Sequence, residues 1–223
     1  MSPDLRPEDI RQRYALLCRS TRMEPDEKLL AYGVEQGLDT LEKLIENDLR
    51  NLARKGAPND FADIYLAMQC ELERFRQFCA YPALAQRFVV AFGGGFSAGK
   101  SSLINALLGK KLLATEVDPT TSLPTWLLHG DSNDVCALNL FGHRIGLSAD
   151  ELLSLTHDEP LLYGSNISRL LRAAFITRTD FAWPNLALID TPGYSKDQSN
   201  DRSERTDEHI ARAQLNAAQA VVW

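Results

Sequence analysis

The 223-residue sequence lacks the features that mark several large classes of protein. It has no run of about 18 apolar residues, which a membrane-spanning helix would need, and its charged first residues are unlike a signal peptide. Its four cysteines show no metal-ligand spacing, which favours free thiols in a reducing cytoplasm. The net charge of −6 is spread evenly, so there is no basic face and nucleic acid is not expected as a partner.

The first part of the chain, residues 1–85, has a helical period. Apolar residues recur every three or four positions over 26–55 and again over 61–79, which is typical of amphipathic helices. Gly56 and Pro58 interrupt the pattern between them, and a shorter helix is predicted at 7–20. We therefore expect a helical hairpin with a third, weaker element, and we expect the apolar stripes of both long helices to be core.

The second part, residues 86–223, alternates short apolar strands with helices. Continuous apolar runs at 88–92 and 186–189 are typical of strands buried on both faces, and residues 220–223 begin a further strand. Segments 125–129 and 135–141 flank a turn at 130–134 and are predicted to form a hairpin. Ser148 and Glu151 have the spacing of a capping box. This alternation predicts an α/β domain with a largely parallel sheet.

A glycine-rich stretch follows the first of these strands. Residues 94–101, GGFSAGKS, match the phosphate-binding pattern G-x-x-x-x-G-K-[ST] in the required position between a strand and a helix. Glycines let successive backbone N–H groups point at a phosphate chain, and the dipole of the following helix adds to the attraction. We expect Lys100 to contact the β- and γ-phosphates, and the Ser101 hydroxyl to bind Mg²⁺.

Two further segments complete this interpretation. Asp190 ends an apolar strand and would hold Mg²⁺, while the N–H of Gly193 would meet the γ-phosphate. The polar residues 194–209 are typical of a mobile switch segment. Between the two motifs, either Thr120 or Thr121 would close over Mg²⁺ and the γ-phosphate. The predicted nucleotide-binding residues are Gly94, Gly95, Phe96, Ser97, Ala98, Gly99, Lys100, Ser101, Ser102, Asp190 and Gly193.

Three stretches, taken in this order, resemble the dynamin family of GTPases, most of all the bacterial dynamin-like proteins. They are GGGFSAGKSSLINALLG, VDPTTSLPT and LALIDTPG. The resemblance implies a P-loop GTPase domain preceded by neck helices, with GTP and Mg²⁺ as ligands and a low affinity for nucleotide. It also implies self-association through the GTPase domains and action on membrane lipids, as a cytoplasmic protein at the inner face of a membrane. By position, Lys100, Thr121 and Ser97 become catalytic, and Ser101, Thr121 and Asp190 become metal ligands.

The sequence departs from the family in two places. Phe96 stands where eukaryotic dynamins carry a catalytic glutamine, and Tyr194 stands where small GTPases carry one, so slow hydrolysis by the monomer is expected. No [TN]-K-x-D motif for reading guanine follows Gly193, and the last residues lie within an apolar run. We therefore expect an N-terminal fragment, with a helical neck segment at 1–85 and a GTPase domain at 86–223 that stops before the guanine motif.

Two other functions remain compatible with the residues. A ribosome-assembly-type GTPase shares the Gly-Lys-Ser and Asp-Thr-Pro-Gly motifs, although such proteins commonly carry the basic surface that this composition lacks. A nucleotide-binding scaffold with little hydrolysis is suggested by Phe96 and Tyr194.

Overall fold

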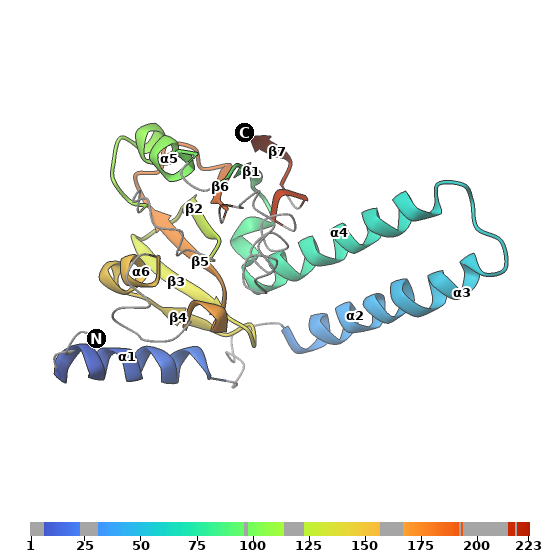
Figure 1. The fold of residues 1–223 in the computed structure, drawn as a ribbon, viewed down its shortest axis with the longest axis horizontal. Helices are drawn as coiled ribbons and strands as arrows, with labels where there is room; N and C mark the ends of the chain where they lie inside the picture. The colour runs from blue at the N-terminus through green and yellow to red at the C-terminus, as the bar shows by residue number, and fades with distance from the viewer. Residues whose placement is uncertain are drawn as a thin grey trace. The chain divides into compact units, whose positions relative to one another are not determined.

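The computed structural model describes residues 7–22, 31–95, 98–113, 123–156, 167–191, 193, 214–216 and 218–223. The chain divides into two compact units (Figure 1). One, here called the α/β unit, combines Met1–Pro25 with Phe88–Trp223, and the other, here called the hairpin unit, is Asp26–Arg87.

The hairpin unit consists of two helical arms joined by residues 54–60 (Figure 1). The first arm is α2 (Ala31–Lys43), the π-helical η1 (Leu44–Leu49) and α3 (Arg50–Ala53). The second arm is α4 (Phe61–Ala80), followed by the short 3₁₀ helix η2 (Pro82–Leu84). α2 packs against α4, and an ion pair of 2.8 Å between Arg76 and Glu42 links them. The structure thus confirms two long helices with a break after residue 53.

The prediction that both apolar stripes are core is wrong for much of their length. Ile45 and Leu72 are buried between the arms, but Leu52 and Phe75 are 61% and 51% exposed. Each arm has one partner helix in this unit, which covers a narrower band than the stripe. The π-helical turn η1 also shifts the residues after it relative to a 3.6-residue period. The exposed members of the predicted stripes are Leu41, Leu52, Ile64, Met68 and Phe75.

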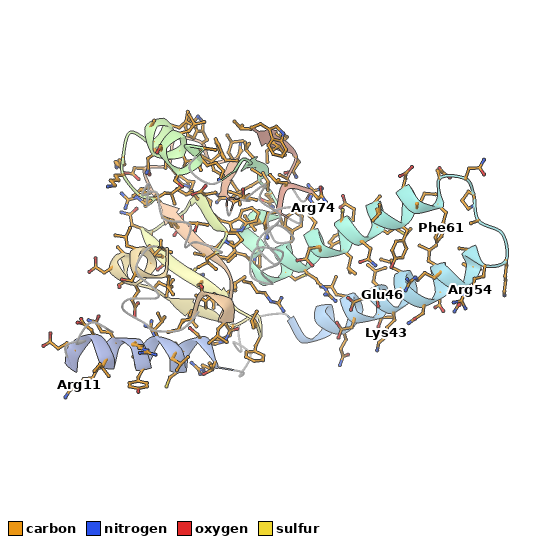
Figure 2. All side chains as sticks on the ribbon, viewed as in Figure 1. Arg11, Lys43, Glu46, Arg54, Phe61 and Arg74 are labelled. Carbon is orange, nitrogen blue, oxygen red and sulfur yellow. The ribbon has the colours of Figure 1, made fainter. Side chains whose placement is uncertain are left out.

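Charged residues are also distributed along the two arms, as the stick view shows. Figure 2 labels Lys43, Glu46 and Arg54 on the first arm and Phe61 and Arg74 on the second. Arg74 lies 3.5 Å from Glu71 on the same helix, and its guanidinium lies over the ring of Phe78. The hairpin unit is therefore amphipathic.

The described residues of the α/β unit form a seven-stranded sheet in the order β4-β3-β5-β2-β6-β1-β7. The strands are β1 (Phe88–Phe92), β2 (Thr125–His129), β3 (Asp134–Asn139), β4 (Arg144–Gly146), β5 (Leu171–Arg178), β6 (Leu186–Asp190) and β7 (Ala220–Val222). β1 is parallel to β6 and β7, and β2 is parallel to β5, whereas the other pairs are antiparallel. The α/β class is confirmed, with a sheet that is mixed in direction.

Strands β2 and β3 do not pair with each other, so the predicted hairpin over 125–141 is wrong. β5 lies between them, parallel to β2 and antiparallel to β3. The loop at 130–133 crosses the end of β5, where the Gly130 N–H donates to the Arg178 carbonyl. β5 is buried over most of its length and therefore needs a strand on each side. The hairpin that does form joins β3 to β4 through residues 140–143.

Helices α5 (Lys100–Leu108) and α6 (Ala149–Thr156) follow β1 and β4, and the 3₁₀ helix η3 (Ile167–Leu170) leads into β5. The capping box at the start of α6 is confirmed. The Glu151 N–H donates to Ser148 Oγ at 3.0 Å, and the Ser148 N–H donates to the Glu151 carboxylate at 2.9 Å. These bonds satisfy backbone donors that the first helical turn leaves free.

The first helix, α1 (Pro7–Ser20), groups with the α/β unit, although we expected it to join the other helices in a segment at 1–85. Leu16 is fully buried in the core of the α/β unit. Arg19 pairs with Glu151 and donates to the Gly146 carbonyl, and the Asn139 amide donates to the Ser20 carbonyl. Side-chain contacts more than a hundred residues apart in sequence therefore decide where α1 lies.

Candidate nucleotide-binding site

The glycine-rich loop connects β1, which ends at Phe92, to α5, which begins at Lys100. Gly99 has a φ of 85°, in the left-handed region that side chains with a Cβ avoid. At Gly94 φ is 141°, and an added Cβ would lie 3.2 Å from the Cβ of Ala98. The Leu103 N–H donates to the Gly99 carbonyl at 2.8 Å and so closes the first turn of α5. The loop conformation thus needs glycine at both positions. Helix α5 begins at the residue after Gly99.

Lys100 folds back over this loop. Its ammonium donates to the carbonyls of Gly94 at 3.1 Å and Gly95 at 3.0 Å. Burial lowers the pKa of Lys100, and the nearby charge of Asp190 partly offsets that effect. The ammonium is therefore a partly desolvated donor held at the inner side of the loop, where phosphate oxygens could replace the two carbonyls as its acceptors.

Ser101 and Asp190 meet from different elements, 89 positions apart in the sequence. The Ser101 hydroxyl at the start of α5 donates to Asp190 Oδ2, at the end of β6, at 2.6 Å. Burial raises the pKa of Asp190, while the Ser101 hydrogen bond and the charge of Lys100 act in the opposite direction. The other carboxylate oxygen, Oδ1, is buried and has no hydrogen-bond partner among the residues that the structure describes.

This pair has the chemistry of a magnesium site. Mg²⁺ prefers oxygen ligands and is usually held by one or two protein oxygens together with water and substrate phosphates. The buried oxygen of Asp190 and the Ser101 hydroxyl are such ligands, and Lys100 is close enough to influence the carboxylate. Within the described ranges there is no group of three or more His, Cys, Asp or Glu side chains that could hold a metal.

The residues after Asp190 lie next to the root of the glycine loop. Thr191 is buried, and its hydroxyl donates to the carbonyl of Phe92 at 2.6 Å. Gly193 is also buried. The end of β6 and the end of β1 are thus connected by a side-chain hydrogen bond as well as by the sheet.

The structure brings Gly94, Gly95, Lys100, Ser101 and Asp190 together, as the sequence predicts, and their roles in binding stay predictions. Ala98, Gly99 and Ser102 lie on the exposed side of the loop and of the first turn of α5. The remaining candidates, Phe96, Ser97, Thr120, Thr121 and the segment 194–209, lie outside the described residues.

Asn105 is a structural residue that the sequence analysis missed. It is buried on α5, its Oδ1 accepts from the N–H groups of Leu112 and Leu113 at 2.8 and 2.9 Å, and its Nδ2 donates to the Leu113 carbonyl at 2.7 Å. A lone amide in the apolar run LINALL was the available signal, because a buried polar group needs partners. Asn105 fixes the chain that leaves α5.

No helix in the described part of the chain has both the length and the apolar character needed to cross a membrane.

Comparison with known proteins places this chain in a family. The model of the Dynamin family matches residues 90–223. Two relatives are Isoniazid-induced protein IniC of Mycobacterium tuberculosis, from strains CDC 1551 / Oshkosh and ATCC 25618 / H37Rv. Each is 29% identical to this chain over 161 residues, and the match covers 69% of this chain and 29% of the relative. The chain thus spans about three tenths of the length of these curated relatives.

Two solved structures are also similar. Both come from an oligomerised bacterial dynamin pair described as providing a mechanism for the long-range sensing and tethering of membranes. The first has a TM-score of 0.44 and 18% identity, covering 83% of this chain and 30% of its own. The second has a TM-score of 0.42 and 16% identity, covering 92% of this chain and 33% of its own.

Proposed function

This chain belongs to the dynamin family of GTPases, and from that premise we propose that it binds GTP together with Mg²⁺ and hydrolyses the bond between the β- and γ-phosphates. In the full-length protein, nucleotide binding is coupled to self-association through the GTPase domains and to binding or remodelling of membranes at their cytoplasmic face. The nucleotide chemistry is supported by the site, and the coupling rests on membership of the family.

The observation that carries the proposal is the bond between Ser101 and Asp190. A hydroxyl at the N-terminus of a helix donates at 2.6 Å to a buried carboxylate whose second oxygen has no partner in the described part of the chain. An isolated buried carboxylate is costly, and a cation that engages both side chains would remove that cost. A glycine loop and a lysine directly beside this pair supply donors for the phosphates that such a cation accompanies.

Each residue has a distinct task in the proposed reaction. Lys100 exchanges its two loop carbonyls for β- and γ-phosphate oxygens, and backbone N–H groups of residues 94–99 surround the phosphates. Ser101 and Asp190 hold Mg²⁺, which when bound neutralises phosphate charge. Thr121 and the N–H of Gly193 respond to the γ-phosphate, and Ser97 helps to hold a charge-compensating cation.

The bond changes are those of a hydrolysis. Water attacks the γ-phosphorus, the bond from that phosphorus to the bridging oxygen breaks, and GDP, inorganic phosphate and a proton leave. Since Phe96 and Tyr194 cannot orient water as a glutamine amide does, we expect slow turnover by the monomer and faster turnover on self-association.

Phosphate release by the purified full-length protein tests this function. We expect Mg²⁺-dependent release from GTP that exceeds release from ATP and increases with liposomes. Ser101→Ala should lower the rate at least about tenfold, as expected when a transition-state contact is lost, whereas Ser132→Ala, an exposed serine in the loop after β2, should not change it.

Three outcomes would redirect the proposal. Equal rates with ATP and GTP would refute guanine specificity. Stimulation by RNA but not by liposomes would favour a ribosome-assembly GTPase, and tight nucleotide binding without turnover would favour a scaffold.

A further inference from the structure

Thr191 lies where the end of β6, the end of β1 and the start of the glycine-rich loop meet. Its hydroxyl donates to the carbonyl of Phe92 at 2.6 Å, and both residues are buried, at 4% and 3% exposed. In the sheet, Phe92 of β1 is the registered partner of Asp190 of β6. The Thr191 bond therefore lies one step beyond the last registered pair and extends the connection between the two strands.

The two strands separate directly after this bond. Beyond Phe92 the chain enters the glycine loop, and on the other side of the site Asp190 turns its carboxylate to Ser101 at 2.6 Å. Asp190 is adjacent to Thr191 in the chain, so a change in the backbone at 191 moves the carboxylate directly. A displacement of about 1 Å in a site of this kind can change a rate by two orders of magnitude.

The bond is local to the site and is not needed to define the strands. The β1–β6 pairing already runs over five registered pairs, from Phe88 opposite Leu186 to Phe92 opposite Asp190. On its other side, β1 is held by β7, where the Gly93 N–H donates to the Val222 carbonyl at 2.8 Å. Removing one hydroxyl at the end of β6 should therefore leave the sheet intact and loosen the end where Asp190 lies.

We propose that Thr191 is a positioning residue. By tying the end of β6 to the last carbonyl of β1, its hydroxyl holds the Asp190 carboxylate at the distance from Ser101 at which both can engage one divalent cation. Thr191 itself touches neither nucleotide nor metal. This inference rests on the proposed function for the identity of the ligands.

The test uses two substitutions at this position in the full-length protein. Thr191→Val keeps the branched shape and removes the hydroxyl, whereas Thr191→Ser keeps the hydroxyl and removes a methyl group. Thr177→Val is a matched control, because Thr177 is another buried threonine of the same sheet whose hydroxyl donates to a backbone carbonyl, that of Asp134, at 3.3 Å.

The first readout is binding of a fluorescent GDP analogue across a Mg²⁺ titration, with EDTA as the zero point. For Thr191→Val we expect the Mg²⁺ concentration that gives half of the metal-dependent increase in affinity to rise about tenfold, with the affinity in EDTA unchanged. Thr191→Ser and Thr177→Val should match the wild type. The second readout is GTP turnover, where Thr191→Val should lower kcat about tenfold and change KM at saturating Mg²⁺ less than twofold.

Several results would overturn the inference. One is a Thr191→Val protein with a lower melting temperature but unaltered Mg²⁺ dependence, which would show a purely structural threonine. Another is a Thr191→Ser protein as impaired as Thr191→Val, which would show that the hydroxyl is not responsible. A third is a Thr177→Val protein with the same Mg²⁺ defect, which would show a general effect of destabilisation.

The proposed function can fail separately. If the wild-type protein binds nucleotide with Mg²⁺ but releases no phosphate from GTP, hydrolysis is refuted, and the binding titration still decides the role of Thr191. Wild-type protein whose nucleotide binding is absent or insensitive to Mg²⁺ would overturn both.

Discussion

Replacing Lys100 with alanine should weaken nucleotide binding about 10- to 100-fold while leaving the α/β unit folded. Lys100 is the first residue of α5, and its ammonium donates to the carbonyls of Gly94 and Gly95 in the loop that precedes it. Lys100 is not part of the hydrophobic core cluster of the α/β unit. The fold should therefore persist, and the effect should fall on binding.

The magnitude follows from the exchange of partners. Because the ammonium already donates to two carbonyls at 3.0 and 3.1 Å, nucleotide binding replaces those bonds with bonds to charged phosphate oxygens. Loss of a charge-assisted hydrogen bond costs about 1.5–3 kcal/mol of binding free energy. Burial lowers the pKa of Lys100, but its side chain is only partly buried, so water still screens the ammonium and the whole of this range is kept. At about 1.4 kcal/mol for each tenfold change, the expected loss is one to two orders of magnitude.

Titration with a fluorescent nucleotide measures this loss, and circular dichroism reports the fold. Lys110→Ala is the matched control, since Lys110 lies just beyond α5 and pairs on the surface with Asp180, away from the loop. It should bind nucleotide as the wild type does. Unchanged affinity in a folded Lys100→Ala protein would refute the placement of the phosphates against this lysine.

Three further predictions concern other residues of the α/β unit. Because burial raises the pKa of Asp190, its ionised form costs stability, a cost that is absent below about pH 3.8 and grows as the pH rises through the pKa of the folded state. In EDTA, the Asp190→Asn protein should therefore unfold at a higher temperature than the wild type at pH 7.5 and at the same temperature near pH 3. It should also lose Mg²⁺-dependent nucleotide binding. A melting temperature below that of the wild type at pH 7.5 would contradict this prediction. Asn105→Ala should lower the free energy of unfolding in urea by about 2–4 kcal/mol, because two N–H groups and one carbonyl lose their partner, and a loss below about 1 kcal/mol would mean that water replaces the amide. Thr121→Ala should reduce kcat much more than nucleotide affinity, and a larger effect of Thr120→Ala would shift the switch threonine by one residue.

Much of the candidate site was accessible from the sequence because its parts are local. A buried strand, a glycine loop and a helix lie within 21 residues, from Phe88 to Leu108, and the structure has them in that order. The Asp190 strand end was recognisable for the same reason. What the sequence could not supply was the distance between Ser101 and Asp190, since that depends on β6 pairing with β1, where the partners Phe88 and Leu186 are 98 positions apart.

The incorrect predictions share a physical cause. The hairpin over 125–141 was inferred from nearness in sequence, but β5, buried on both faces, pairs with both of its strands and separates them. The apolar stripes of the helical arms were inferred to be core, but burial depends on how many helices cover them, and Phe75 remains 51% exposed. Propensity and period describe one segment at a time, whereas pairing and coverage are properties of several.

The sequence by itself determined the helices α1 and α4, the capping box at Ser148 and the glycine-rich turn between β1 and α5, because each is set by backbone sterics and by contacts within a few residues. Only the tertiary structure decided the strand order, the docking of α1 through Leu16 and Arg19, and the bond from Thr191 to Phe92. The docking of α1 and the Thr191 bond join residues about a hundred or more positions apart, and the pairing of β5 with β2 and β3 joins residues more than thirty positions apart. Such contacts form when buried surface and buried polar groups are satisfied over the whole unit, and no local pattern specifies which distant partner will satisfy them.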